Sequence, residues 1–173
     1  MIFSSGVGAW RTYLTLYPNG SFEGEYTDAD AGVAGEDYPH GTVYICQFHG
    51  RFGEIKQMDA TSYSLVLKEL VMDTGYPEGE AWIEEGVRYV SSAPYGLDGE
   101  DGEVLKPGAV FRFYTPEATG HEPGSSLYGA AEFCSWMPER RRLVSEADTL
   151  DHYGLHNLEM DYGFFSTGVM ERT

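Results

Sequence analysis

Positive charge is scarce in this sequence, and the scarcity limits the partners that it can bind. Eleven of the 173 residues are Lys or Arg, against 28 Asp and Glu, and the formal net charge is −17. Binding to DNA or RNA needs clustered Lys and Arg side chains that neutralise phosphates. An anionic membrane surface makes the same demand. We therefore expect neither partner, and the acidity is compatible with solubility or with divalent cations.

Long apolar runs and cysteines are scarce as well. No stretch approaches the roughly 18 apolar residues of a membrane span, and Met1-Ile2-Phe3 opens without the basic and apolar regions of a signal peptide. We expect a cytoplasmic protein or a piece of a longer exported one. The two cysteines, Cys46 and Cys134, are too few for a disulfide scaffold. One bridge and two reduced, buried thiols remain open alternatives.

Motifs of known catalytic sites are absent from the sequence. The run GSSLYG at 124–129 is one residue too long for the Gly-x-Ser-x-Gly nucleophile elbow, and Gly6-Val7-Gly8 lacks the third glycine of a dinucleotide loop. His152 and His156 have a spacing that binds zinc on a helix, but Gly154 between them disfavours a helix. Both cysteines lie in apolar surroundings, which favour inert thiols. We expect a domain without catalytic activity.

Aromatic residues and glycines are abundant, and their pattern predicts strands and turns. Residues 10–17 alternate between two faces, Pro18-Asn19-Gly20 predicts a tight hairpin, and residues 22–27 form the return strand. The sequence predicts further strands at 42–52, 62–70, 82–92 and 109–114, and Gly50 marks a bend or bulge in the first of them. One or two closing strands are expected within 149–168. A short helix is expected at 126–137, capped by Ser125 or Ser126. This succession indicates a single mostly β domain over residues 1–173, an antiparallel barrel or sandwich with one short α-helix.

The start of the first of these strands resembles a known signature. Gly8-Ala9-Trp10 is similar to the Gly-x-Trp motif of lipocalins and related calycin barrels. The resemblance implies a calycin-like barrel in which Trp10 closes one end. It also implies that an arginine from a later strand, Arg88 or Arg112, covers the indole ring.

A second resemblance covers more of the chain. The runs FSSGVGAW, LYPNGSFEGEYTDADAG, YPHGTVYICQFHGRF and GVRYVSSAPYGL, spanning Phe3 to Leu97, resemble an uncharacterised family of bacterial β domains, with a weaker echo in FCSWMP. Such domains are often carried on lipoproteins or exported proteins. The resemblance implies a place in the cell envelope and supplies no catalytic residues. The missing signal sequence departs from that pattern.

Carboxylates gather in the expected loop at 28–41. Asp28 and Asp30 have the alternating spacing of calcium ligands, and Glu36 follows closely. The full EF-hand pattern is absent, because Val33 stands where the loop needs glycine and Pro39 where it needs a bidentate glutamate. The segment is either a calcium site formed by Asp28, Asp30 and Glu36 or a solvated acidic turn.

Exposed tyrosines favour a binding function. Tyr13 and Tyr17 alternate with Trp10, so they face outward if Trp10 faces inward. Tyrosine rings on a sheet face can stack on sugars or pack against a protein. We predict a non-catalytic binding domain for a small molecule, glycan or protein partner, held in the barrel mouth or on the tyrosine face by Trp10, Tyr13, Tyr17 and Arg88. The alternatives are a calcium-stabilised structural or adhesion domain and, third, a hydrolase; the oligomeric state stays open.

Overall fold

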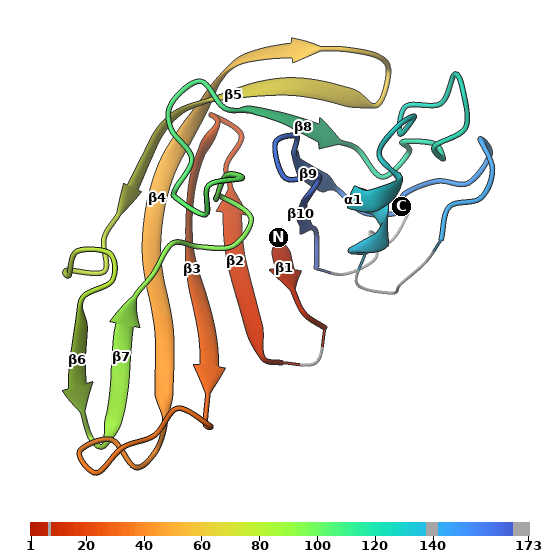
Figure 1. Ribbon diagram of the computed structural model, residues 1–173. Coiled ribbons are helices and arrows are strands. Elements are labelled where there is room, and N and C mark those ends of the chain that lie inside the picture. The colour runs from red at the N-terminus through yellow and green to blue at the C-terminus, as the bar shows by residue number, and fades with distance from the viewer. Residues whose placement is uncertain (7, 138–141, 168–173) are drawn as a thin grey trace.

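In the part of the chain that the structure describes, the fold is built from ten strands and one short helix (Figure 1). The computed structural model describes residues 1–6, 8–137 and 142–167. The elements are β1 (Ile2–Ser4), β2 (Trp10–Leu16), β3 (Ser21–Asp30), β4 (Thr42–Gln57), β5 (Ser62–Met72), β6 (Ala81–Glu84), β7 (Val87–Ser91), β8 (Val110–Tyr114), α1 (Ala131–Ser135), β9 (Gly154–Asn157) and β10 (Tyr162–Phe165).

Eight of the strands close into an antiparallel barrel, which confirms the predicted mostly β class and the barrel in particular. The ring runs β3-β2-β1-β10-β9-β8-β5-β4, and β4 pairs back onto β3. Closure pairs the edges that an open sheet would expose. The long strand β4 also pairs in parallel with β7 over Thr42–Ile45, so the β6–β7 hairpin extends outside the ring (Figure 1).

Two glycines allow the barrel wall to bend sharply. A Cβ atom on Gly24 of β3 would lie 2.1 Å from the Tyr13 carbonyl oxygen and 2.4 Å from Cζ of Phe48. A Cβ on Gly50 of β4 would lie 2.3 Å from the Glu69 oxygen. Only a residue without a side chain fits such close approaches. A register shift in the β4–β5 pairing follows immediately after Arg51, so the predicted bend or bulge near Gly50 is confirmed.

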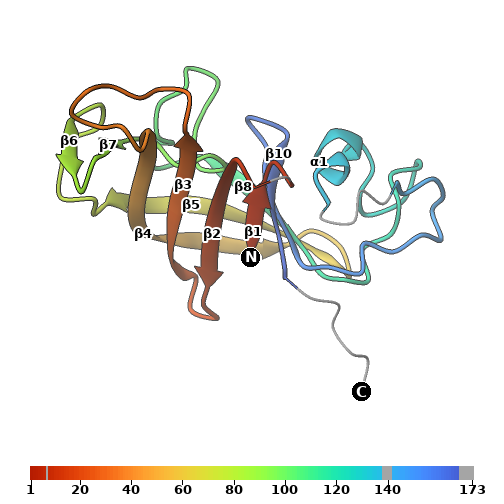
Figure 2. The ribbon, with the colours of Figure 1, turned by 90° about the horizontal axis from the view of Figure 1, so that it is seen from below.

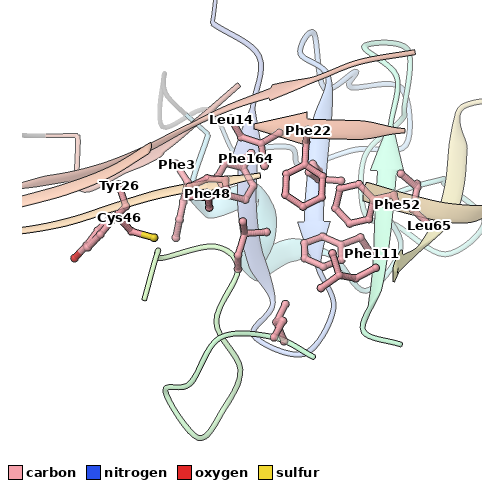
Figure 3. Packing of buried hydrophobic residues seen from close by; sticks show 14 residues of the cluster. Phe3, Leu14, Phe22, Tyr26, Cys46, Phe48, Phe52, Leu65, Phe111 and Phe164 are labelled. Atoms are coloured by element: carbon pink, nitrogen blue, oxygen red, sulfur yellow. The ribbon is translucent and has the colours of Figure 1, made fainter. Parts of the chain in front are cut away.

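The barrel interior is filled by hydrophobic side chains (Figure 3). Alternate residues of each strand point inward, and the ring of Phe52 lies 4.8 Å from that of Phe22 and 5.0 Å from that of Phe111, between centroids. The segment 92–109 adds Leu97 and Leu105, both buried, to the same cluster. The interior is therefore the core of the protein.

A second apolar cluster forms where α1 and the connecting segments near it lie beside the barrel strands. Figure 2 shows α1 at this side of the barrel. The cluster is formed by Tyr114 and Phe165 from the barrel strands, Phe133 and Cys134 from α1, and apolar residues of the connecting segments, Leu127, Leu143 and Leu150 among them. Phe133 stacks on Phe165 with ring centroids 4.6 Å apart. This packing attaches α1 to β10.

The structure corrects the helix expected at 126–137. Helix α1 covers only Ala131–Ser135, and its N-cap is Ala130, which makes no side-chain cap hydrogen bond. The Ser125 hydroxyl instead donates to the Glu122 carbonyl oxygen, 2.7 Å away. Serine side chains bond to nearby carbonyls as readily in turns as at helix starts, so the capping signal was ambiguous.

Two strand boundaries also differ from expectation. The strand expected at 82–92 is the hairpin β6–β7, which reverses at Glu85 and Gly86, both with positive φ. The loop expected at 28–41 begins later, because Asp28 and Asp30 pair with Tyr44 and Thr42 at the end of β3. The expected strand at 109–114 and two closing strands within 149–168 are confirmed as β8, β9 and β10.

Candidate ligand-binding site

One end of the barrel is closed by aromatic rings. The indole of Trp10 lies 4.8 Å from the ring of Phe3, 5.1 Å from that of Tyr95 and 6.1 Å from that of Trp136, between centroids. The Thr12 hydroxyl donates to the Tyr95 carbonyl oxygen at 2.7 Å, which holds the segment 92–109 across this end. Trp10 thus packs into the closed end.

A buried polar network fastens the same segment. The Asp98 carboxylate accepts hydrogen bonds from the Gly96 amide at 2.8 Å and from the Tyr162 hydroxyl at 2.7 Å. The Asn157 amide donates to the Asp98 carbonyl oxygen at 2.9 Å. Burial raises the pKa of Asp98 despite these hydrogen bonds, which act in the opposite direction. These polar groups bond to one another, so the network fastens the segment 92–109 to the barrel strands.

The opposite end of the barrel carries an apolar pocket of about 330 Å³, called the mouth pocket below. Its residues come from the β2–β3 hairpin (Leu16, Tyr17, Pro18 and Gly20) and from the strand ends facing it (Ile55, Tyr63, Leu65 and Phe113). The side-chain polar atoms of this lining are the Tyr17 and Tyr63 hydroxyls and no others. The pocket suits a molecule held by hydrophobic contact.

The walls of the mouth pocket are held in place by main-chain contacts. The Phe52 amide donates to the Gly20 carbonyl oxygen at 2.8 Å, which ties the hairpin to β4. Gly20 has φ +84°, and a Cβ there would lie 2.7 Å from the Phe52 oxygen, so the contact requires glycine. On the other wall Phe113 stacks on Tyr153 with centroids 5.6 Å apart. The pocket is therefore preformed.

The four residues predicted to bind a ligand lie in different places. Trp10 packs in the closed end, Tyr17 lines the mouth pocket, and Tyr13 faces outward from β2. Arg88 lies on β7 outside the ring, with its guanidinium 5.8 Å from the centre of the Tyr38 ring. Only Tyr13 and Tyr17 are brought together, in a groove on the outer face of the barrel.

Sequence reasoning missed the residues opposite the hairpin in the mouth pocket. Ile55 and Tyr63 lie on either side of the turn between β4 and β5, and Phe113 lies near the end of β8, all three well away from the β2–β3 hairpin in the chain. The alternating pattern of 62–70 and 109–114 indicates their strands. That these residues meet the β2–β3 hairpin follows only from the order of strands in the ring.

The predicted calcium ligands remain a prediction. Asp28 and Asp30 lie at the end of β3, where the Asp30 carboxylate accepts a hydrogen bond from the Gly32 amide at 2.9 Å. Burial, and then the charge of Asp30, raise the pKa of Asp28. Within residues 1–6, 8–137 and 142–167, no group of three or more His, Cys, Asp or Glu side chains lies close enough to hold a metal ion.

The two thiols are free and buried, which decides between the alternatives left open by the sequence. Cys46 belongs to the barrel core and Cys134 to the cluster around α1. Burial raises the pKa of Cys46 to about 11 and that of Cys134 to about 12. Because the thiolate is the nucleophile, neither thiol is activated for covalent chemistry at neutral pH.

His156 is a buried base with a carboxylate partner. Its Nε2 lies 2.7 Å from the Asp161 carboxylate, and its ring stacks on Phe133 with centroids 4.4 Å apart. Burial lowers the pKa of His156, although the bond to Asp161 acts in the opposite direction. The ring packs beside the second apolar cluster, against Phe133 and Tyr114.

Comparison with known proteins adds no identification. Neither the protein-family models, nor the curated proteins, nor the solved structures gave a match to this chain. In the part of the chain that the structure describes, no helix has the length and apolar character needed to cross a membrane.

Proposed function

We propose that this protein is a non-catalytic binding domain that takes a small, uncharged apolar molecule into the mouth pocket. The observation that carries the proposal is the predominantly apolar lining of the pocket at the barrel end opposite Trp10. A preformed apolar pocket with a few polar groups is the usual form of a small-molecule site. The hydroxyl of Tyr63 would orient such a molecule, because the Tyr17 hydroxyl is bonded to the Glu23 carboxylate.

The volume of the mouth pocket sets the size of the ligand. An engineered cavity of about 150 Å³ holds a benzene molecule. The mouth pocket, at about 330 Å³, has room for a molecule of roughly two fused rings. The net charge of −17 disfavours an anion, so a neutral molecule fits best.

The resemblance of Gly8-Ala9-Trp10 to the lipocalin signature agrees with this proposal. A calycin-like barrel closed at one end by a tryptophan leaves the opposite mouth for a ligand. Here the interior below the mouth is filled by Phe52, Phe111 and other core residues. We therefore propose binding at the mouth, and not deep inside the barrel.

The test uses N-phenyl-1-naphthylamine, a neutral two-ring dye whose fluorescence rises in apolar surroundings. Ile55 in the mouth pocket and Ile83 on β6 are exposed to nearly the same extent, 53% and 49%. The matched variants are therefore Ile55→Gln and Ile83→Gln, and neither should change stability by more than about 0.5 kcal/mol. A buried methylene contributes about 0.8 kcal/mol, so the loss of one to two methylene contacts in Ile55→Gln should weaken dye binding roughly four- to fifteenfold.

Saturable binding of one dye molecule per chain, weakened by Ile55→Gln and unchanged by Ile83→Gln, supports the proposal. No binding at millimolar protein, or equal effects of the two variants, refutes it. Sedimentation of both variants gives a second readout. If Ile55→Gln converts a dimer into monomers, the pocket is an interface between copies and the small-molecule proposal is wrong.

A further inference from the structure

A groove of about 740 Å³ lies on the outer face of the barrel, across β2, β3 and β4. The strand register places outward side chains in rows across these strands. Tyr13 lies opposite Glu25, which lies opposite Gln47, and the next row pairs Glu23 with His49. This surface, called the outer groove below, is walled by Tyr13, Tyr17, Glu23, Glu25, His49 and Asp73.

Two tyrosine rings stand at the walls of the outer groove. Tyr13 and Tyr17 are each 40% exposed, and four residues of strand separate them by roughly 14 Å. The Arg11 guanidinium lies 5.7 Å from the centre of the Tyr13 ring and covers one face. The Tyr17 hydroxyl donates to the Glu23 carboxylate at 2.6 Å, which holds that ring toward β3. Both rings are thus held in position before any ligand arrives.

Hydrogen-bonding groups of both kinds line the space between the rings. Glu25 offers carboxylate oxygens, and the Gln47 side chain offers both an amide donor and a carbonyl acceptor. His49 is bonded to the Asp73 carboxylate, which orients its ring. The groove therefore combines aromatic faces with closely spaced donors and acceptors.

These features fit a carbohydrate better than a peptide. The main-chain ladder of β3 is paired with β2 on one side and β4 on the other, so no peptide strand can add to it. Phe22 and Phe48 of the lining are buried, so the apolar rings that the groove exposes are those of Tyr13 and Tyr17, a small area for a protein hot spot. The C–H face of a pyranose ring is slightly positive and stacks on the negative face of an aromatic ring.

We propose that the outer groove binds an oligosaccharide that carries no acidic groups. Tyr13 supplies the stacking face, and Glu25 and Gln47 bond to sugar hydroxyls. The three carboxylates of Glu23, Glu25 and Asp73, on a chain of net charge −17, repel uronate and sialate sugars. The site is separate from the mouth pocket except for Tyr17, which borders both.

The test measures binding of cellohexaose, maltohexaose and the hexamer of N-acetylglucosamine, with hexagalacturonate as the acidic comparison. Tyr13→Ala should weaken binding of the preferred neutral hexasaccharide about tenfold, and Tyr13→Phe should preserve it, because stacking needs the ring and not the hydroxyl. Tyr128→Ala is the matched control, since Tyr128 is 66% exposed and lies outside the groove. Melting curves of the three variants verify that each is folded.

The proposal is supported if a neutral hexasaccharide binds, if Tyr13→Ala weakens that binding and if Tyr13→Phe and Tyr128→Ala do not. The affinity should also be the same at about 50 and 500 mM salt. Three outcomes overturn it: no binding of any neutral hexasaccharide at millimolar concentration, equal loss with Tyr13→Ala and Tyr128→Ala, or tighter binding of hexagalacturonate. If hexalysine binds more tightly than every glycan and is released by salt, the groove is a site for basic peptides and the proposal is wrong.

Discussion

Replacing Gly24 with alanine should destabilise the barrel more than any ordinary surface change. The added Cβ would lie 2.1 Å from the Tyr13 carbonyl oxygen, which belongs to the neighbouring strand, and 2.4 Å from the buried ring of Phe48. Neither neighbour can move freely, because the oxygen is part of the sheet and the ring is 2% exposed. Overpacking of this kind lowers the free energy of unfolding by about 1–3 kcal/mol. Because the added Cβ meets two such neighbours, we expect a loss near 3 kcal/mol for Gly24→Ala.

Urea unfolding followed by tryptophan fluorescence measures this loss, and a thermal melt should show a fall of about 6–12 °C for a chain of this length. Gly32→Ala is the control, because the nearest atom to its Cβ would be the Asp30 carboxylate oxygen, at 3.2 Å on an exposed side chain that needs to shift only slightly. Its effect should stay within about 0.5 kcal/mol. If Gly24→Ala loses less than about 1 kcal/mol, or no more than Gly32→Ala, the close packing of β2 on β3 is not what the structure indicates.

Three further predictions concern titratable groups. Because burial lowers the pKa of His156 in the folded state, its stabilising contribution is complete above the unfolded pKa of about 6.5 and is lost as pH falls toward the folded pKa. Between about pH 7 and pH 5 the unfolding free energy should therefore fall less for His156→Gln than for the unchanged protein. An equal fall in the two proteins contradicts this prediction. Cys46 and Cys134 should react with Ellman's reagent only after unfolding, and rapid reaction of either native thiol contradicts their burial. If Asp28 and Asp30 form a calcium site, the melting temperature should be about 5–11 °C higher in saturating calcium than in chelator. Changing both residues to Asn should abolish this difference, and equal melting temperatures of the unchanged protein in calcium and chelator refute the site.

The alternating pattern of residues 10–17 was enough to predict one hairpin and its faces. Leu14 is buried, Tyr13 and Tyr17 are exposed, and the turn at Pro18-Asn19-Gly20 joins β2 to β3. Such local patterns work because side chains alternate across a strand whatever the strand pairs with. The same alternation holds on β4, where Cys46 and Phe48 are buried.

Local pattern was misleading where packing decided the backbone. The apolar spacing from Leu127 to Met137 indicated a helix of three turns, but most of these residues reach the second cluster from turns, and α1 covers only Ala131–Ser135. The glycine at 129, with φ +80°, interrupts the segment. An apolar residue can be buried from either conformation, so burial alone did not specify a helix.

The sequence by itself determined the mostly β class, the acidic surface and the outward position of Tyr13 and Tyr17, because composition and alternation act locally. The tertiary structure alone decided which barrel end is filled and which carries the mouth pocket. That difference depends on the segment 92–109 crossing one end and on Ile55, Tyr63 and Phe113 meeting the hairpin at the other. The β2–β3 hairpin, the pair Ile55 and Tyr63, and Phe113 lie far apart in the chain. Only the closed ring of strands brings them together, because side chains at matching heights on neighbouring strands become neighbours when the register closes.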